Sequence, residues 1–387
     1  MDRSQRKHAS STAGDAPVAP STLDTASMLQ LAMLPGLGPR TLTALLDHFD
    51  TPDEVLCAST SELIRIQGVG KELVHKIQTA SDHVAVGRIR QWCDDHNVQI
   101  VDRFDDAYPY HLQRLSDAPP LLFVQGDVLT EDEIAVAIVG TRHASPYGLR
   151  QAERFGYSLA QAGVTVISGL ARGIDTAAHE GALNGGGRTL AVLGSGLKHI
   201  YPSENQKLAA KIAASGAVIS EYAPDTKPRG GLFPQRNRLI AGISLATLVI
   251  EAPERSGSLI TARLAMEQNR DVLAVPGSVE SRASRGCNRL IRDGAVLVQT
   301  VDDVLEAIGP MERPAKTSTG AEVRRPSELQ LNELETKVLQ AIETTSTAID
   351  QVIQNSQLPA SRVISIISVL EMRCLVRRLS GQYVSRV

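Results

Sequence analysis

Short apolar runs that alternate with helix-like segments fill residues 136–298, and they constrain the fold of this 387-residue chain more than any other feature. Each run has four to six apolar residues, ends in Gly, Ser, Glu or Pro, and precedes a helical pattern, and the alternation repeats about five times. This pattern is typical of βαβ units and predicts a parallel sheet covered by helices. Because ligands bind at the carboxyl ends of parallel strands, we predict a binding site in the loops that follow the strands.

The loops after these strands combine glycines with cationic side chains. Glycine lets the backbone approach a ligand closely, and the free N–H groups of a following helix attract phosphate. Because five loops share the pattern, we favour anion binding over tight turns alone. The glycines are Gly140, Gly169, Gly173, Gly194, Gly196 and Gly257, and the cations are Arg142, Arg172, Lys198, Arg236, Arg238 and Arg255.

The missing nucleotide motifs narrow the choice of anion. The sequence has no G-x-x-x-x-G-K-[ST] loop and no G-x-G-x-x-G fingerprint, because Gly194-Ser195-Gly196 continues as Leu-Lys-His. A phosphate polymer held by several loops remains, and single-stranded nucleic acid suits a cationic groove with stacking aromatic residues. The net charge of −3 argues against binding by bulk charge, but residues 226–293 hold eleven Lys or Arg against six Asp or Glu.

Eight spaced segments resemble the DNA-processing family DprA, also called Smf, and occur in that family's order. They cover roughly residues 105–307 and read GTRHASPYG, SGLARGIDTAAHEGAL, LGSGLKHIYP, SEYAP, FPQRNRLIAG, EAPERSGSLITA, VPG and RGCNRLIRDGA. The resemblance implies an α/β, Rossmann-like, doubly wound sheet that binds single-stranded DNA without catalysis and forms a homodimer. It also implies that the protein protects incoming DNA in natural transformation and helps load the RecA recombinase. Residues 226–232 depart from the family pattern, which leaves the conformation of that loop open.

We predict a DNA-binding set drawn from five loops. Arg142, in a Gly-Ser/Thr-Arg loop like that of the family, is expected to bind phosphate bidentately. The trio from Arg236 to Arg238 is expected to open a helix that continues to Ile243, where it either clamps a phosphate or braces the loops. The full set is Gly140, Thr141, Arg142, Ser168, Gly169, Arg172, Gly173, Gly194, Ser195, Gly196, Lys198, Tyr201, Arg236, Asn237, Arg238, Ser256, Gly257 and Ser258.

Three other polar residues have roles that the sequence leaves open. Asp175 and His179 lie four residues apart on one helix face, where we favour a structural hydrogen bond because no third metal ligand is evident. We therefore predict no metal and no cofactor. Glu251 ends a strand, and its carboxylate either accepts from a base or ribose or holds Arg238 in place; we favour the bracing role.

The rest of the chain divides by composition and resemblance. We predict a disordered tail at 1–25, a helix-hairpin-helix or SAM-like domain at 26–80, the Rossmann-like domain at 81–308, a linker at 309–330 and a winged helix at 331–387. Two Gly-x-Gly hairpins occur at 36–38 and 68–70. Their backbone N–H groups are expected either to hold DNA phosphates or only to cap and pack helices. The third helix of the predicted winged helix carries few basic residues, so a protein contact or a weak role in DNA binding is as good an interpretation as specific readout.

Four scattered cysteines, no apolar run of transmembrane length and no visible signal peptide predict a cytoplasmic protein without structural disulfides or zinc. Two alternatives to a single-strand binder remain. One is a nucleotide hydrolase that uses Glu251 and Arg238, with Ser168 or Ser195 as the nucleophile. The other is a regulator that reads DNA through its winged helix. We favour the binder because no G-x-S-x-G elbow and no acid–base dyad are present.

Overall fold

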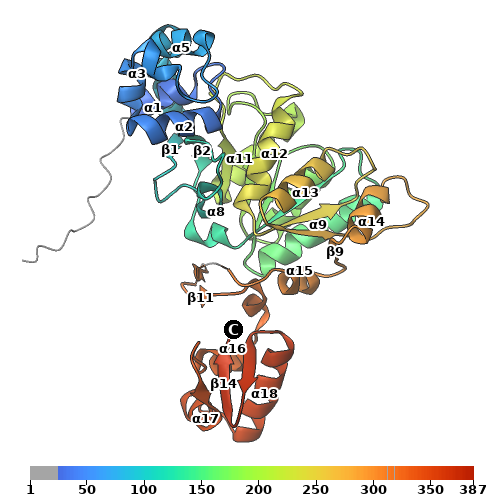
Figure 1. Cartoon of the computed structure of the whole chain (residues 1–387). Helices are drawn as coiled ribbons and strands as arrows, with labels where there is room; N and C mark the ends of the chain where they lie inside the picture. The colour runs from blue at the N-terminus through green and yellow to red at the C-terminus, as the bar shows by residue number, and fades with distance from the viewer. Residues whose placement is uncertain (1–24, 312, 318) are drawn as a thin grey trace, which may run out of the picture. The chain divides into compact units, whose positions relative to one another are not determined.

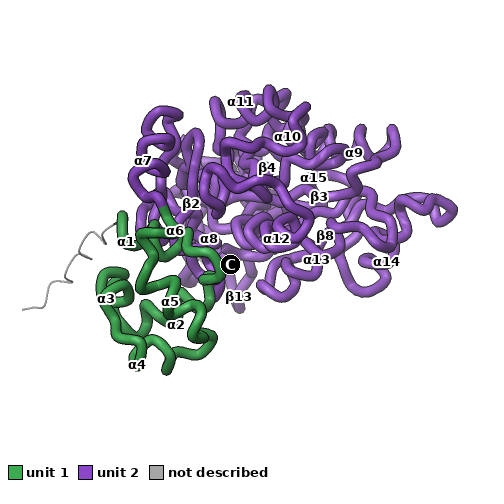
Figure 2. The backbone as a smooth tube through the Cα atoms, turned by 90° about the horizontal axis from the view of Figure 1, so that it is seen from above, with its two compact units in different colours: residues 1–84 green, residues 85–387 purple. Residues whose placement is uncertain are grey.

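The structure is a computed structural model that describes residues 25–311, 313–317 and 319–387. Contacts divide the chain into two compact units, residues 1–84 and 85–387, which are described separately (Figure 2). The disordered tail predicted at 1–25 lies outside the described residues, apart from Thr25, which begins the first helix.

The described part of the first unit is helical. Both predicted Gly-x-Gly hairpins lead into helices, because Gly38 is the N-cap residue of α2 and Gly70 is that of α5. Leu42, Leu45 and Ile77 on these helices are buried. The helices are α1 (Thr25–Ala32), α2 (Pro39–Phe49), α3 (Pro52–Cys57), α4 (Thr60–Leu63), α5 (Lys71–Gln78) and α6 (Ala80–His83).

A nine-stranded sheet with the order β1-β2-β6-β5-β4-β3-β7-β8-β9 organises the second unit (Figure 1). All neighbours from β6 to β9 are parallel, whereas β1 and β2 are antiparallel, which confirms the mostly parallel α/β prediction. The strands are β1 (Val98–Asp102), β2 (Leu121–Gly126), β3 (Ala135–Gly140), β4 (Thr165–Ser168), β5 (Thr189–Val192), β6 (Ala217–Ser220), β7 (Ala246–Ile250), β8 (Asp271–Ala274) and β9 (Val296–Leu297).

Helices cover both faces of this sheet, as a doubly wound fold requires. Val136 and Ile138 of β3 join the core cluster of α9, α10 and α15, while Ala137 and Val139 join that of α12, α13 and α14. The helices of this part are α7 (Val86–Asp95), α8 (Tyr110–Gln113), α9 (Pro146–Gln161), α10 (Ile174–Asn184), α11 (Gln206–Ser215), α12 (Leu232–Ile243), α13 (Ser258–Glu267), α14 (Arg285–Arg292) and α15 (Val301–Ala307), with 3₁₀ turns η1 (Thr130–Glu133) and η2 (Ser203–Asn205).

The order of the strands reverses between β3 and β7. From β3 the chain winds outward through β4, β5 and β6, and it then returns to pair β7 with the other side of β3. The ends of the two strands meet in register, because Gly140 pairs with Ile250. Such a switch point leaves a crevice at the carboxyl ends of the strands, so the topology places the site there.

The described residues of the segment predicted as a linker include regular secondary structure. It forms a ribbon of β10 (Ala315–Lys316) and β11 (Glu322–Val323), followed by the 3₁₀ turn η3 (Pro326–Gln330). Ala315 and Val323 are buried in the core cluster that contains α9. Two apolar residues in a polar stretch therefore hold part of this segment on the second unit, a feature that composition alone does not reveal.

The C-terminal region has the predicted winged-helix architecture. Three helices pack with an antiparallel sheet of order β12-β14-β13, in which β12 follows the first helix and β13 and β14 follow the third. Val363, Ile367 and Val384 are fully buried in their common core. The elements, drawn from orange to red in Figure 1, are α16 (Glu333–Gln340), β12 (Thr347–Ala348), α17 (Ile349–Ser356), α18 (Ala360–Met372), β13 (Val376–Leu379) and β14 (Tyr383–Arg386).

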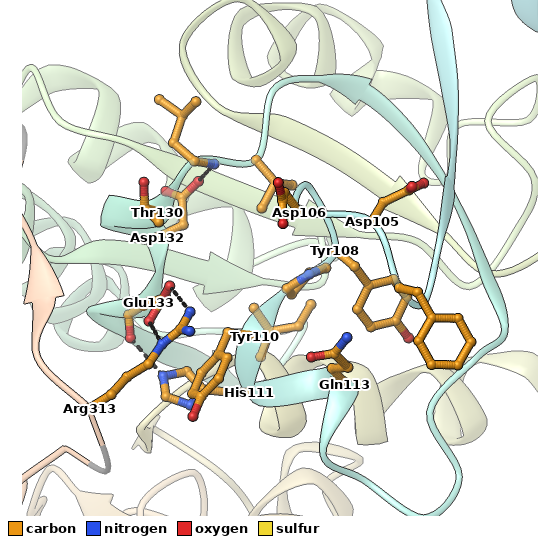
Figure 3. A pocket seen from close by; sticks show the side chains of 15 residues that line it. Asp105, Asp106, Tyr108, Tyr110, His111, Gln113, Thr130, Asp132, Glu133 and Arg313 are labelled. Carbon is orange, nitrogen blue, oxygen red and sulfur yellow. Dashed lines mark hydrogen bonds and ion pairs between the residues drawn. The ribbon is translucent and has the colours of Figure 1, made fainter. Parts of the chain in front are cut away.

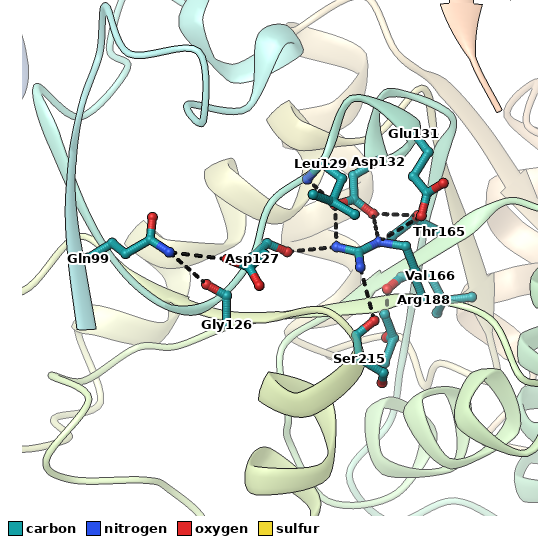
Figure 4. A network of polar contacts seen from close by, with 11 residues as sticks. Gln99, Gly126, Asp127, Leu129, Glu131, Asp132, Thr165, Val166, Arg188 and Ser215 are labelled. Atoms are coloured by element: carbon teal, nitrogen blue, oxygen red, sulfur yellow. Dashed lines mark hydrogen bonds and ion pairs between the residues drawn. The ribbon is translucent and has the colours of Figure 1, made fainter. Parts of the chain in front are cut away.

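A polar network around Arg188 closes the amino ends of the central strands (Figure 4). The guanidinium donates to both carboxylate oxygens of Asp132 at 2.8 Å, and it also donates to the carbonyl oxygens of Asp127 and Ser215. Asp132 accepts a further hydrogen bond from Thr165 Oγ1 at 2.7 Å. Because the Asp132 side chain is only 2% exposed, loss of Arg188 would leave a buried carboxylate without its cation.

Arg188→Ala should therefore lower the free energy of unfolding of the second unit by about 3 kcal/mol. Urea unfolding followed by the fluorescence of Trp92, the single tryptophan of the chain, checks this, because Trp92 lies in α7 of that unit. Arg263→Ala is the matched control and should cost less than about 1 kcal/mol, because the Arg263–Glu267 pair is exposed. Equal losses in the two variants would contradict the role assigned to the network.

His179 is a structural residue of α10 rather than a metal ligand. Its Nδ1 lies 2.7 Å from Thr189 Oγ1, whose hydroxyl donates to the Val166 carbonyl, so His179 Nδ1 carries the proton and donates to Thr189. Nε2 has no hydrogen-bond partner among the described residues. Burial, with a contribution from the charge of Arg236, lowers the pKa of His179 to about 3. His179 thus makes a structural hydrogen bond with Thr189 rather than with Asp175, and the imidazole stays neutral at physiological pH.

This lowered pKa makes the fold sensitive to acid. The unfolded chain takes up a proton on His179 below about pH 6.5, whereas the native chain does so only near its depressed pKa, so stability is lost as the pH falls through this window. As the pH falls from about 6 to 4, the free energy of unfolding should decrease more steeply in the wild type than in His179→Asn. The difference in slope should be about 1 kcal/mol per pH unit. Urea titrations at several pH values measure it. His143→Asn, at an exposed position, should keep the wild-type slope.

Candidate nucleic-acid interface

A cleft of about 710 Å³ opens at the switch point between β3 and β7. All five predicted strand-end loops contribute to its wall, together with the first turns of α12 and α13. Nine predicted residues line it: Gly140, Thr141, Arg142, Tyr201, Arg236, Asn237, Ser256, Gly257 and Ser258. Gly169 and Arg172 line a small adjoining hollow that shares Arg142, Tyr201 and Arg236 with the cleft.

An exposed arginine and two aromatic rings form one wall of the cleft. The guanidinium carbon of Arg142 lies 5.1 Å from the centroid of the Phe233 ring, and the rings of Phe233 and Tyr201 are 5.5 Å apart. Arg142 makes no ion pair within the described part of the chain. A free guanidinium beside accessible rings can bind a phosphate and stack a base at the same place.

Two arginines of this cleft were missing from the predicted set. Arg229 and Arg255 are exposed and line it, so four arginines face the cleft against one carboxylate, that of Asp175. Arg229 lies in the loop at 226–232, whose unusually basic sequence was the available signal. Arg255 follows Glu251 by four residues, in the loop that leads into α13, and the sequence marks it only as a cation beside the glycines. Phe233, which carries the aromatic wall, was also left out of the set.

Arg236 braces the loops instead of opening a helix. The expectation that the trio from Arg236 to Arg238 begins a helix is wrong, because α12 starts at Leu232 and Arg236 lies in its second turn. Its Nη1 donates to the carbonyl oxygens of Gly169, at 2.8 Å, and of Val192. A Cβ on Gly169 would lie 2.5 Å from this guanidinium, so a side chain at this position would displace Arg236 from its two carbonyl partners.

The environment of Arg236 links its charge to the cleft. Burial lowers the pKa of Arg236 to about 10, the negative charge of Asp175 opposes this shift, and the positive charge of Arg142 adds to it. Asp175 accepts hydrogen bonds from the N–H groups of Gly169 and Ala171 at 3.1 and 3.4 Å, and burial raises its pKa. The charges of Arg142 and Arg236 therefore repel each other within the cleft, and an anion bound between them would relieve their repulsion.

Two predicted cations of the strand-end loops form exposed ion pairs. Arg172 donates to both carboxylate oxygens of Glu204 at 2.5 and 2.9 Å, and its guanidinium carbon lies 6.0 Å from the centroid of the Tyr201 ring. Lys198 pairs with Asp225 at 2.7 Å. Because exposed pairs of this kind contribute little to stability, a phosphate can replace either carboxylate at small cost.

Seven predicted residues line neither the cleft nor the hollow: Ser168, Gly173, Gly194, Ser195, Gly196, Lys198 and Arg238. The Ser168 hydroxyl donates to the Ile138 carbonyl at 2.6 Å, and that of Ser195 donates to the His199 carbonyl at 2.7 Å. Both side chains are buried, so neither is placed to act as a nucleophile.

The carboxylate–arginine pair of the hydrolase alternative does not form. Arg238 is paired with Glu221 and lies 3.9 Å from a carboxylate oxygen of Asp117. Glu251 instead accepts two hydrogen bonds from Ser145, so the expectation that it holds Arg238 is also wrong. In the described part of the chain, no three His, Cys, Asp or Glu side chains gather at a potential metal site.

A second hollow, of about 450 Å³, has the opposite charge (Figure 3). Four carboxylates line it, from Asp105, Asp106, Asp132 and Glu133, against one arginine, Arg313. Arg313 pairs with Glu133 at 2.6 Å and stacks 3.5 Å from the centroid of Tyr110. This hollow lies at the amino end of β3, and its acidity makes it unsuitable for a nucleic acid.

Among the described residues, no helix is long and apolar enough to span a membrane.

Comparisons with known proteins agree with this architecture. Residues 99–309 match the family described as DNA recombination-mediator protein A, residues 322–382 match a DprA winged-helix domain, and residues 28–80 match a SAM-like helix-hairpin-helix tandem. Protein Smf of Synechocystis sp. is 34% identical, over 94% of this chain and 99% of its own length. DNA processing protein DprA of Streptococcus pneumoniae is 46% identical over 52% of this chain and 71% of its own length.

A solved structure extends the likeness to three dimensions. The X-ray structure of DNA processing protein A from Streptococcus pneumoniae superposes with a TM-score of 0.64 at 35% identity, covering 73% of this chain and 96% of that one. The family match spans more than half of the chain, and the Synechocystis relative covers nearly all of it. This chain therefore belongs to the DprA/Smf family of DNA-processing proteins.

Proposed function

We propose that this chain binds single-stranded DNA in the cleft between β3 and β7, without catalysing a reaction on it. The observation that carries the proposal is the wall formed by Arg142, Phe233 and Tyr201, in a cleft that four arginines and one carboxylate line. Unpaired bases expose faces that can stack on these rings, whereas a duplex keeps its base faces inside its own stack. Family membership supports DNA as the ligand, because the relatives are named DNA processing proteins.

The proposed role in transformation, the transfer of DNA to RecA and the homodimer rest on family membership. As a recombination mediator, the protein would protect incoming single strands during transformation and pass them to RecA, acting as a homodimer through its Rossmann-like domain. The internal hydrogen bonds of Ser168 and Ser195 and the separate partners of Glu251 and Arg238 support a non-catalytic role.

Sequence-specific reading of duplex DNA by the winged helix receives little support. Helix α18 carries one cation, Arg362, and it exposes the apolar residues Ile364 and Met372. A recognition helix needs several polar or basic side chains that reach base edges and phosphates. The winged helix therefore fits a protein contact better than base readout.

Fluorescence anisotropy with a labelled oligo-dT, a matching duplex and a free mononucleotide at several salt concentrations tests the proposed function. Tight, salt-dependent binding of the single strand, with weak binding of the duplex and no competition by the mononucleotide, is the expected result. Preferential binding of the mononucleotide would overturn the proposal, and only turnover of it would establish the hydrolase alternative.

Arg142→Ala should weaken oligo-dT binding by about tenfold, because one charge-assisted contact to phosphate is lost. The slope of log K against log salt should become shallower by about 0.7, the value expected for one phosphate contact on a single strand. Arg263→Ala removes an equal charge from an exposed site outside the cleft and should leave both quantities near the wild-type values. An unchanged slope in Arg142→Ala would remove this residue from the interface.

A further inference from the structure

Helix α9 carries aromatic and cationic side chains on its solvent side. They recur at spacings of three, four and three residues, which place them on one face of the helix. All of them are exposed, whereas Phe155 on the same helix is buried in the core. The surface that they form, the α9 stripe, consists of Tyr147, Arg150, Arg154 and Tyr157.

The hydrogen bonds of the α9 stripe orient its side chains and leave its charge intact. The Tyr147 hydroxyl donates to the Pro276 carbonyl at 2.9 Å, and Arg154 Nη2 donates to the Gln299 carbonyl at 2.6 Å. Neither Arg150 nor Arg154 makes an ion pair within the described part of the chain. The two guanidinium groups are therefore available to an external anion.

The α9 stripe begins beside the cleft. Arg142 and His143 line the cleft, and Tyr147 follows them in the first turn of α9. The hydrogen bond from Tyr147 to Pro276 ties the start of the stripe to the loop that follows β8, at the same edge of the sheet. Since an α-helix rises 1.5 Å per residue, the stripe extends about 15 Å from Tyr147 to Tyr157. The surface thus continues from the cleft and is not an isolated patch.

Exposed tyrosines gather at the cleft and on α9. Aromatic residues make up only 3% of the sequence, and four of its seven tyrosines are exposed. Three of these four are Tyr201 in the cleft and Tyr147 and Tyr157 on the α9 stripe. Bases of a single strand stack on such rings, while guanidinium groups bind the phosphates. The alternation of rings and cations along α9 therefore matches the chemistry of an unpaired strand.

We propose that the α9 stripe is a second contact surface for single-stranded DNA, which receives the part of the strand that leaves the cleft past Arg142. The tyrosines stack unpaired bases, and the arginines bind phosphates between them. The charge of the helix suits a polyanion, because Glu153 is the single carboxylate among the residues of α9. This inference rests on the proposed function, since it extends the path of the strand that the cleft binds.

Oligo-dT of two lengths separates the α9 stripe from the cleft. A strand of about 6 nucleotides is expected to occupy the cleft alone, whereas one of about 20 nucleotides also reaches α9 and should bind the wild type at least about tenfold more tightly. Arg150→Ala should weaken binding of the longer strand by about fivefold and make its slope of log K against log salt shallower by about 0.7, because one phosphate contact is lost. Binding of the shorter strand should stay at the wild-type value.

Tyr157→Ala tests the stacking contact. It should weaken binding of the longer strand by about fivefold or more and leave the salt slope unchanged, because a stacked base carries no phosphate contact. Tyr157→Phe keeps the ring and should bind as the wild type does. The replaced side chains are exposed, so the variants should fold, which the fluorescence of Trp92 checks.

Two control variants match these substitutions. Arg263→Ala removes an exposed arginine from α13, and Tyr383→Ala removes a tyrosine of similar exposure from the winged helix. Both should bind the two strands with wild-type affinity. A loss in either control as large as that in the α9 variants would show that the effect does not come from the stripe.

Three results would overturn the proposal. One is wild-type affinity for the longer strand in both α9 variants, and another is equal weakening of the two strands, which would mean that the substitutions act through the cleft. The third is an altered oligomeric state in analytical ultracentrifugation with unchanged DNA binding. The stripe would then be a protein interface, where tyrosine and arginine are also favoured.

The two strand lengths also distinguish this inference from the proposed function. A wild type that binds the shorter strand and gains nothing from the longer one would remove the α9 stripe from the path and leave the cleft in place. A wild type that binds neither strand would remove both the proposed function and the inference that rests on it.

Discussion

A buried guanidinium holds the candidate interface in shape. Arg236 reaches from the second turn of α12 to the carbonyl oxygens at the ends of two neighbouring strands, those of Gly169 and Val192. Burial lowers its pKa to about 10, so the side chain remains charged at physiological pH although it is removed from water. An arginine that is buried, charged and committed to two carbonyl groups fixes the spacing of the loops, and the exposed residues of the cleft depend on that spacing.

The same interaction explains why Arg142 is suited to an external partner. Arg142 adds positive charge beside Arg236, and this charge helps to lower the pKa of the buried arginine. The nearby carboxylate of Asp175 only partly balances the two, because it is also committed to the backbone N–H groups of the loop after β4. The lining of the cleft thus retains an unbalanced positive charge that the fold itself maintains. A bound phosphate would neutralise the positive charge of Arg142 and Arg236 that Asp175 leaves unbalanced.

The sequence predicts the fold better than it predicts the partners of single side chains. The alternation along residues 136–298 predicted a parallel sheet, and the Gly-rich strand ends predicted where the cleft lies, because both depend on local periodicity. The sequence could not separate Arg142, which is exposed, from Arg236, which is buried, since that difference depends on whether α12 begins at Leu232 or with the trio from Arg236 to Arg238. The partner of Glu251 is 106 residues away, so no local pattern reveals it.

Charge is segregated along the strand direction, although the chain as a whole has a net charge of only −3. Arginines dominate the cleft at the carboxyl ends of β3 and β7, whereas carboxylates dominate the hollow beside the amino end of β3. The parallel winding reinforces this separation, because every βα unit places the positive end of a helix dipole at the carboxyl end of its strand. At α9 the Glu251 carboxylate cancels that contribution locally, while α12 and α13 begin at the cleft with glycine N-cap residues and no side-chain cap. The unblocked helix ends and the exposed arginines therefore lie on the same part of the surface, which favours a ligand that carries several separate negative charges over one that concentrates them at a single seat.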